Sequence, residues 1–332
     1  MENSSPRSAR TVVVGGGTMG ADVAVVLARG GAQVTVVDPH AARRDHLLPH
    51  IAQELAAAGQ TTHAGPVQVC ASLQDVDWSG VVLVVECITE QLAAKQKLFA
   101  ELETVAPPNA VLASNSSGFP ISAIASGLPT AQRMLGLHFF MPAHLVPLVE
   151  VVLGERSDPA LGTWLHAFMR GCGSVPVLVK KDKPGFLANR MQHALSREAF
   201  ALIDEGIASP EDVDAAVRFG FGFRFLAAGP VLQRDHAGIE VHTAAAATMY
   251  PTLSNTDVPA QALRDKVAQG TLGMKTGKGF FDWPEDRKQA ERARYDTLLR
   301  QGLALLASEL PTIEPPTATS PTDTPSTTGA RA

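Results

Sequence analysis

The sequence predicts an α/β fold in which a doubly wound parallel sheet is followed by an all-helical domain. Up to about residue 183, short apolar runs that suit buried strands alternate with segments of helical spacing. After Pro184 the pattern changes to helices only. Near the start of the chain, three consecutive valines lead directly into closely spaced glycines, which is typical of a buried strand that turns into a helix. These observations predict two domains of different architecture.

The glycines after the first strand indicate a phosphate-binding turn. Gly15, Gly17 and Gly20 have the G-x-G-x-x-G spacing, and Thr18 and Met19 lie between the second and third glycines. The first glycine of such a turn permits a tight bend, the second lets the backbone approach a pyrophosphate, and the third lets the helix pack on the strand. The N–H groups and the dipole of the helix then face the phosphates. A glycine-rich turn without a ligand is the alternative interpretation.

The residues that follow favour nucleotide binding. A helix is expected over residues 21–30 and a second strand over residues 33–37, which leads into Asp38. An acid at this place, about twenty residues past the glycines, accepts hydrogen bonds from a ribose 2′-hydroxyl and repels a 2′-phosphate. We therefore expect a Rossmann-type domain that binds NAD rather than NADP.

Composition and charge exclude several classes of protein. The 332 residues are 45% hydrophobic and 18% charged, which is ordinary for a globular chain long enough for two domains. The net charge of -5 does not favour binding to nucleic acid or to an anionic membrane. Cys70, Cys87 and Cys172 are widely spaced without a C-x-x-C, so neither a disulfide framework nor a metal site is expected. With no secretion signal and no apolar run of spanning length, we expect a cytoplasmic protein.

Polar residues collect where the strands of the first domain end. In an open α/β sheet the carboxyl ends of parallel strands form the edge at which ligands bind, so Glu90, Asn115 and Ser117 are candidate site residues. Loop and helix capping is the alternative for any one of them. The elements expected after Asp38 are helices over residues 41–58 and 91–105 and strands over residues 67–70, 81–85 and 111–113.

A histidine and a glutamate stand out in the apolar segment of residues 134–153. His138 closes one apolar strand, and Glu150 lies inside the next. A carboxylate in so apolar a run is costly to bury unless it is paired, and an imidazole is the obvious partner. The carboxylate would then fix the tautomer of the ring and raise the basicity of its other nitrogen, as a general base requires. A core histidine and a solvent-facing glutamate are the alternatives. His144 is a rival base, but it lies in a Pro-bounded loop without a paired acid, so we expect a structural role for it.

Four separated motifs together resemble one enzyme family. They are the glycine turn ending in Met-Gly, Ser-Asn-Ser-Ser, His-Phe-Phe-x-Pro followed by Pro-Leu-Val-Glu-Val-Val, and Lys-Asp-Lys-Pro-Gly-Phe-Leu-Ala-Asn-Arg. In this order they resemble the NAD-dependent L-3-hydroxyacyl-CoA dehydrogenases, which include the 3-hydroxybutyryl-CoA dehydrogenases. The similarity runs from about Arg10 to Trp283.

The resemblance implies roles for individual residues. His138 falls on the position of the catalytic base and Glu150 on that of its orienting acid, while Ser117 and Asn189 fall on positions that hold the substrate oxygens. In this scheme the base removes the 3-hydroxyl proton as hydride leaves for the nicotinamide. The cofactor positions implied are Asp38 at the adenosine ribose, and Glu90, Lys95 and Asn115 near the nicotinamide and its ribose.

Two departures from the family bear on the substrate. Met141 stands where the family usually has asparagine, and the segment between Asp38 and Glu86 is short and free of lysine, so only Arg43 and Arg44 remain to meet a CoA phosphate. We expect interconversion of an L-3-hydroxyacyl-CoA and its 3-oxoacyl-CoA, as in fatty-acid metabolism. The alternative is a dehydrogenase of a free hydroxy acid, similar to those acting on carnitine, gulonate or a pyridine carboxylate.

Two further classes of NAD-binding protein share part of this pattern. A catalytically silent, crystallin-like NAD-binding protein would keep the glycine turn and Asp38 but would not need the four catalytic positions together. The lysine-dependent 3-hydroxy acid dehydrogenases place a lysine four residues before the asparagine of the interdomain helix, where this chain has Gly185. Both classes are therefore less favoured.

The domain boundaries follow from these patterns. We expect a flexible N-terminus over residues 1–9, the NAD-binding domain over 10–183, a helical substrate and dimerisation domain over 184–310, and a disordered Pro/Thr-rich tail over 311–332. By the resemblance, the second domain makes a homodimer. Its helices are expected over residues 185–205, 210–219, 230–250, 258–269 and 285–306.

Overall fold

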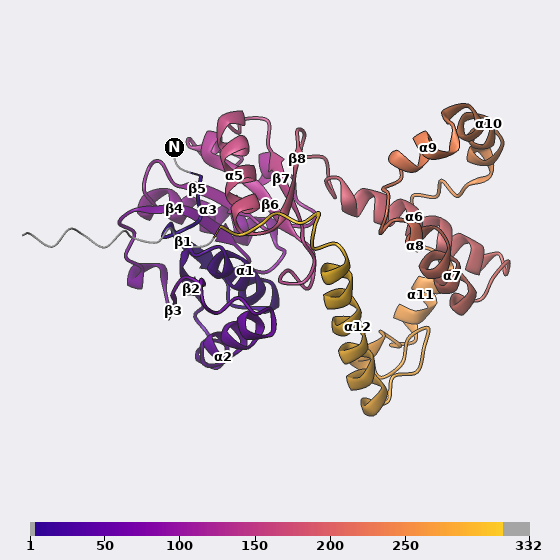
Figure 1. Cartoon of the computed structure of the whole chain (residues 1–332), viewed down its shortest axis with the longest axis horizontal. Coiled ribbons are helices and arrows are strands. Elements are labelled where there is room, and N and C mark those ends of the chain that lie inside the picture. The colour runs from indigo at the N-terminus through magenta and orange to yellow at the C-terminus, as the bar shows by residue number, and fades with distance from the viewer. Residues whose placement is uncertain (1–3, 315–332) are drawn as a thin grey trace, which may run out of the picture.

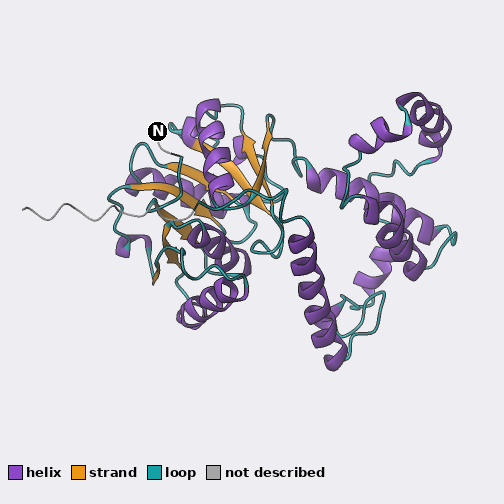
Figure 2. Ribbon diagram, viewed as in Figure 1, coloured by secondary structure: helices purple, strands orange, loops and turns teal. Residues whose placement is uncertain are grey.

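The computed structural model shows an α/β domain and a separate group of helices, joined by the chain that follows the last strand (Figure 1). It describes residues 4–314, so the expectations for residues 1–3 and 315–332 lie outside the described residues. The predicted class is confirmed, since a mostly parallel sheet with helices on its faces is followed by helices alone (Figure 2).

One eight-stranded sheet organises the first domain, in the order β3-β2-β1-β4-β5-β6-β7-β8. Neighbouring strands are parallel except β6 and β7, which pair antiparallel. From β1 the chain continues to β2 and β3 on one side, and it then crosses to β4 on the other side of β1. The sheet therefore has a topological switch point between β1 and β4, where dinucleotides bind in such folds. The strands are β1 (Arg10–Val14), β2 (Gln33–Val37), β3 (Val67–Cys70), β4 (Val81–Glu86), β5 (Val111–Ser114), β6 (Met134–Phe139), β7 (Leu148–Leu153) and β8 (Val175–Val179).

Apolar side chains cover both faces of the sheet, which explains why its strands read as continuous apolar runs. Successive residues of β1 point to opposite faces, so Val13 joins one core and Val12 and Val14 join the other. The first core is shared with helices α1, α2 and α5, and the second with α3 and α4. These helices are α1 (Thr18–Arg29), α2 (Ala41–Ala57), α3 (Leu92–Val105), α4 (Ile121–Ile124) and α5 (Pro159–Gly171), with short turns at η1 (Leu73–Asp75) and η2 (Ala131–Arg133).

The second domain differs in detail from the sequence prediction. The single helix expected over residues 230–250 is wrong, because Gly238 adopts a φ of 94° and separates two helices there. The elements of this domain are α6 (Ala188–Asp204), α7 (Pro210–Ala216), η3 (Val217–Phe221), α8 (Gly222–Arg224), α9 (Leu232–Ala237), α10 (Ile239–Met249), η4 (Tyr250–Thr252), α11 (Gln261–Ala268), η5 (Met274–Thr276) and α12 (Glu285–Leu305).

The helices of the second domain have little core of their own. Within the described chain, no residue of α6 to α12 is buried. Several large apolar side chains are more than half exposed, including Phe219, Phe223, Val231, Ile239, Val241 and Val267. None of the described helices is both long and apolar enough to cross a membrane.

The chain returns to the first domain at its C-terminal end. Helix α12 runs back toward α2, where Arg300 forms an ion pair of 2.6 Å with Glu54 (Figure 1). Beyond α12, Ile313 packs on Gly173, and Arg7 donates a hydrogen bond to the Glu314 carbonyl. Residues 4–9 also contact the α/β domain, because Ser8 donates its N–H to the Gly31 carbonyl at 2.9 Å. Both ends of the described part of the chain, residues 4–9 and 311–314, therefore contact the α/β domain.

Candidate active site

The glycine turn after β1 leaves open space at the start of α1. Gly15 has a φ of 103°, which favours glycine, and a Cβ on Gly20 would lie 1.7 Å from the Gly15 carbonyl oxygen. A Cβ on Gly17, in contrast, would have no described atom within 4 Å. No side chain caps the N-terminus of α1, so its N–H groups are available to an anion. The turn thus has the shape and polarity that a pyrophosphate requires.

Asp38 lies at the end of β2 with its carboxylate held in place. Its Oδ2 accepts a hydrogen bond from the Gly16 N–H at 2.9 Å, and its Oδ1 accepts one from the His40 N–H at 2.8 Å. Arg43 approaches the same carboxylate at 3.5 Å, and Arg44 donates to the Asp38 carbonyl at 2.8 Å. A fixed carboxylate at this position suits a ribose diol.

A cavity of about 1190 Å³ joins the glycine turn to Asp38. Its wall includes Thr18, Met19, and His46 and His50 of α2. The open backbone at Gly17 and the carboxylate of Asp38 lie on the same cavity, so the residues present fit NAD. Among the described residues, no group of three or more His, Cys, Asp or Glu could hold a metal ion.

His138 and Glu150 lie directly opposite each other on the antiparallel strands β6 and β7. His138 Nδ1 is 2.7 Å from Glu150 Oε2, and the two side chains are 5% and 0% exposed. The rings of Phe140 and Phe186 pack edge-on against the imidazole, with ring centroids 4.6 and 5.6 Å from its own. The predicted pairing is therefore present, and it leaves Nε2 as the ring nitrogen that can exchange a proton.

Glu150 also holds the start of α6. Its Oε1 accepts hydrogen bonds from the N–H groups of Ala188 at 2.7 Å and Leu187 at 3.1 Å. Burial by itself would raise the pKa of this carboxyl, but the hydrogen bonds from His138 and from these backbone groups outweigh burial and lower the pKa. The carboxylate is thus kept ionised between His138 and a helix N-terminus.

The two residues expected to hold substrate oxygens lie near each other. Asn189, in the first turn of α6, places its Nδ2 3.4 Å from the Ser117 carbonyl oxygen. Ser117 follows β5, and nearby Asn115 accepts the Phe139 N–H on its Oδ1 at 2.9 Å. Asn115 thus ties the end of β5 to the end of the strand that carries His138.

Lys95 and Glu90 form an ion pair outside the lining of the cavity beside the glycine turn, in which Lys95 is buried and Glu90 is 42% exposed. Lys95 is 1% exposed, and its Nζ lies 2.7 Å from Glu86 Oε1 and 3.2 Å from Glu90 Oε2. Glu90 Oε1 accepts hydrogen bonds from Ser116 Oγ at 2.6 Å and from the Ser117 N–H at 3.2 Å. Burial favours a raised pKa for Glu90, but its hydrogen bonds and Lys95 outweigh burial and lower the pKa. This cluster orients the loop that carries Ser117.

Sequence reasoning missed several residues that shape the site. Glu86, fully buried at the end of β4, closes an apolar run just as Glu150 interrupts one, and that signal could have identified it. Phe186 gave no such signal, although its φ of 49° is uncommon outside glycine and its ring contacts His138. The expectation that His144 has no paired acid is wrong, since Asp22 lies 3.0 Å and Glu54 3.1 Å from its ring nitrogens.

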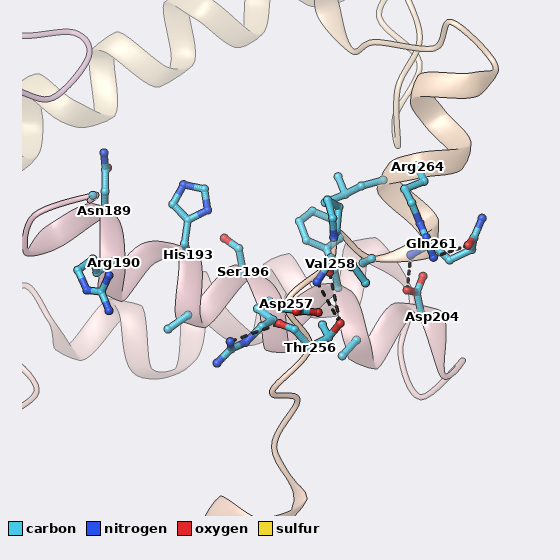
Figure 3. A pocket seen from close by; sticks show the side chains of 18 of the residues that line it. Asn189, Arg190, His193, Ser196, Asp204, Thr256, Asp257, Val258, Gln261 and Arg264 are labelled. Atoms are coloured by element: carbon cyan, nitrogen blue, oxygen red, sulfur yellow. Dashed lines mark hydrogen bonds between the residues drawn. The ribbon is translucent and has the colours of Figure 1, made fainter. Parts of the chain in front are cut away.

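A second cavity, of about 960 Å³, lies along α6 and includes Asn189 at one end (Figure 3). Arg190, His193 and Arg197 line it from α6, and residues 256–261, 263 and 264 line it as well. Three carboxylates, those of Asp204, Glu205 and Asp257, line the same cavity, so its wall carries both charges, with Arg190 at the end next to Asn189.

Comparison with known proteins relates both domains to one family. Residues 10–183 match the NAD-binding domain of 3-hydroxyacyl-CoA dehydrogenase, and residues 185–283 match its C-terminal domain. The chain is 34% identical to 5-formyl-3-hydroxy-2-methylpyridine 4-carboxylate 5-dehydrogenase of Mesorhizobium japonicum, over 85% of this chain and 94% of that protein. It is 33% identical to 3-hydroxybutyryl-CoA dehydrogenase of Mycobacterium tuberculosis, over 82% of this chain and 98% of the relative.

Solved structures show the same two kinds of relative. A 5-formyl-3-hydroxy-2-methylpyridine 4-carboxylic acid 5-dehydrogenase, described as an NAD⁺-dependent dismutase, superposes with a TM-score of 0.85 at 30% identity, covering 91% of this chain and 98% of its own. The (S)-3-hydroxybutyryl-CoA dehydrogenase of Ralstonia eutropha gives a TM-score of 0.68 at 28% identity, covering 83% and 99%.

The glycine turn yields a paired prediction. Gly20→Ala should destabilise the fold, because the added methyl would meet the Gly15 carbonyl, and overpacking of this kind costs about 1–3 kcal/mol. Gly17→Ala should leave the thermal unfolding midpoint unchanged but weaken NADH binding, because its methyl enters the space expected for phosphate. Thermal unfolding and NADH fluorescence titration measure the two effects. Equal NADH affinity in Gly17→Ala and the unaltered protein would contradict this assignment.

The lowered pKa of Glu150 predicts a contribution to acid stability. A carboxyl whose pKa is lower in the folded than in the unfolded state stabilises the fold above the unfolded value, and this stability is lost as the pH falls through the folded value. The free energy of unfolding of Glu150→Gln should therefore fall less steeply below about pH 4.5 than that of the unaltered protein. Urea unfolding at a series of pH values tests this, and parallel curves would contradict it.

Proposed function

The chain belongs to the 3-hydroxyacyl-CoA dehydrogenase family and is an NAD-dependent oxidoreductase acting on a CH–OH group, and we propose that His138 is its general base and a free hydroxy acid its substrate. The observation that carries the substrate proposal is that Arg43 contacts the Asp38 carboxylate and Arg44 donates a hydrogen bond to the Asp38 carbonyl. Those two arginines are the cations that the segment after β2 could offer to a CoA phosphate.

The chemistry proposed for the site follows from its contacts. NAD, when bound, supplies the hydride acceptor. His138 Nε2 takes the hydroxyl proton, and the cationic ring that results is stabilised by Glu150 Oε2, 2.7 Å from Nδ1. Asn189 and Ser117 hold the substrate oxygens, and the Glu150 carboxylate fixes the start of the helix that carries Asn189.

Two observations favour a free acid over a CoA thioester. The arginines after β2 contact Asp38, and the structural likeness to the pyridine-carboxylate dehydrogenase is the greater of the two described above. Arg190, which follows Asn189 in the chain and lines the cavity along α6, is the cation proposed to pair with the carboxylate of the substrate.

An L-3-hydroxyacyl-CoA is the second candidate. The motifs around Ser117, His138 and Asn189 resemble those of the acyl-CoA enzymes, and the relative from Mycobacterium tuberculosis bears the name of one. In that case the CoA phosphates would have to bind Lys180, Lys181 or Lys183 instead of the segment after β2. A catalytically silent protein is less favoured, because it would have no need of the buried His138–Glu150 pair.

We also propose a homodimer formed through the C-terminal helices. Large exposed apolar surfaces mark interaction sites in proteins, and the helices of the second domain bury no residue within the described chain. A second copy of the same helices would cover Val231 and Ile239, which are 78% and 62% exposed.

The role of the base can be tested by replacement. His138→Gln should lower kcat roughly 100- to 10000-fold, the usual contribution of a positioned general base, with NADH affinity nearly intact. Glu150→Gln should also lower the rate and change its pH dependence. His63→Gln, in an exposed turn, is the control and should behave as the unaltered protein. A Glu150 variant with normal rate and pH profile would refute the pairing.

The substrate class can be tested with matched compounds. The purified protein should reduce NAD faster with a free hydroxy acid than with the corresponding CoA thioester, as followed at 340 nm. Arg190→Gln should raise KM for the acid, whereas Arg43→Gln should not. If the full thioester reacts faster than both the free acid and a truncated thioester lacking the nucleotide, remote CoA binding is in use and the second candidate replaces the first.

The assembly can be tested by light scattering. The unaltered protein should have twice the mass of one chain, because its exposed apolar helices need a partner. A double variant, Val241→Glu with Ile239→Glu, should shift the protein toward the monomer. Leu48→Glu changes an apolar residue of the first domain that is 46% exposed, and it should leave the mass unchanged. A monomeric unaltered protein would reject the dimer.

A further inference from the structure

A third cavity, of about 490 Å³, lies where the chain returns from the second domain to the first. Its lining comes from the ends of α1 and α2, from the loop between β6 and β7, and from α12 and the segment after it. Figure 1 shows that last segment, in yellow, running over the α/β domain. No lining residue is shared with the cavity beside the glycine turn or with the cavity along α6, so this is a separate space.

Arg29, the last residue of α1, brings a positive charge to this cavity without an acid to balance it. Its guanidinium donates to the Cys172 carbonyl at 2.8 Å, the His144 carbonyl at 3.2 Å and the Ser174 hydroxyl at 3.2 Å. These acceptors are neutral, and no carboxylate of the described chain forms an ion pair with Arg29. Because a guanidinium carries five N–H groups, donors remain for a further acceptor.

The other polar groups of the lining leave this charge uncompensated. No Asp or Glu is among the described residues that line the cavity. Arg300 is the second guanidinium of the lining, but its charge is balanced by Glu54 at 2.6 Å. Gln60 Oε1 is buried and accepts no hydrogen bond within the described chain. A fitting ligand therefore offers an anionic group to Arg29 and a hydrogen-bond donor to Gln60.

The rest of the lining is largely apolar, and much of it comes from the C-terminal part of the chain. Small-molecule sites commonly combine such a wall with a few polar groups that fix orientation. Residues of α12 and beyond lie past residue 283, where the match to the family's C-terminal domain ends, so the two family domains alone do not form this cavity. The apolar residues from this part are Leu303, Ala304, Ala307, Leu310, Pro311 and Ile313.

We propose that this cavity binds a small carboxylic acid that has an apolar body and a hydroxyl or N–H group. The carboxylate pairs with Arg29, the donor binds Gln60 Oε1, and the apolar body contacts α12. The site goes beyond the proposed function, because it shares no lining residue with the other two cavities. A ligand that contacts both the α/β domain and α12 stabilises the folded protein in which they meet.

Isothermal titration calorimetry with three related compounds tests the chemistry of the site. The probe 4-hydroxyphenylacetate carries both polar groups, 4-hydroxyphenylacetamide lacks the charge, and phenylacetate lacks the donor. Loss of the charge should weaken binding roughly 10- to 100-fold, and loss of the donor about 2- to 10-fold, as expected for charged and neutral hydrogen bonds. Equal affinities for the acid and the amide, or no binding of any of the three at millimolar concentration, would overturn the proposal.

Three variants locate the binding. Ala304→Trp fills the cavity and should abolish binding of 4-hydroxyphenylacetate, whereas Ala290→Trp, on α12 but outside the lining, should bind like the unaltered protein. Gln60→Leu should bind 4-hydroxyphenylacetate no better than phenylacetate. Undiminished binding by a folded Ala304→Trp protein would reject the site. If that variant does not fold, Gln60→Leu decides, and an unchanged preference for the hydroxyl compound would reject it.

Two further titrations separate this site from the proposed active site. Neither Arg190→Gln nor saturating NADH should change the affinity for 4-hydroxyphenylacetate, because the residues concerned line different cavities. Hydrogen exchange at residues 300–313 should slow when the probe is bound. Binding that is lost in Arg190→Gln would place the probe in the cavity along α6 and contradict the proposal. None of these measurements needs turnover, so a protein that oxidises no hydroxy acid refutes the proposed function and leaves them to decide this site.

Discussion

The Glu150 carboxylate joins the two halves of the candidate site. One oxygen contacts His138 on the neighbouring strand, and the other accepts the first N–H groups of α6. A fully buried charge is tolerated only while such partners are in place, so strand register, ring orientation and helix start depend on one another. The antiparallel pairing of β6 and β7 is what brings the two side chains opposite each other.

The same arrangement recurs at two other places near the cofactor-binding edge of the sheet. Glu86 binds the buried Lys95 ammonium together with the Ile88 N–H, and Asp22 binds two imidazoles together with the Ala143 N–H. In each case one acid connects a cation or histidine to a backbone segment of a loop. Each loop is thereby held by charge-assisted hydrogen bonds, which are stronger than neutral ones.

Local patterns allowed much of the α/β domain to be predicted. The valines of β1, the glycine turn and Asp38 are close in sequence, and their spacing reflects the geometry of one strand, one turn and the next strand. The pair of His138 and Glu150 could be predicted from the sequence because a carboxylate in an apolar run needs a partner. Helix α5 and strand β8, in contrast, were not anticipated, although Asp158 and Pro159 are ordinary helix-start residues.

Interactions between segments that are distant in the sequence could not be predicted from local patterns. Nothing near His144 signals Asp22 or Glu54, and nothing near Lys95 shows that it is buried between two acids. The break at Gly238 was missed because an isolated glycine inside an apolar helical pattern is often tolerated. The boundaries of the other helices of the second domain came within a few residues, since Pro210 and Pro284 mark their starts.

The return of α12 to the α/β domain changes how the helical domain can move. That domain is attached at its beginning, through Gly185 and Phe186 before α6, and again at its end, through Arg300 and the residues after α12. Displacing these helices relative to the sheet would therefore disturb two separate attachments. The position of Asn189 beside Ser117 depends on the first of them, because Asn189 lies in the first turn of α6.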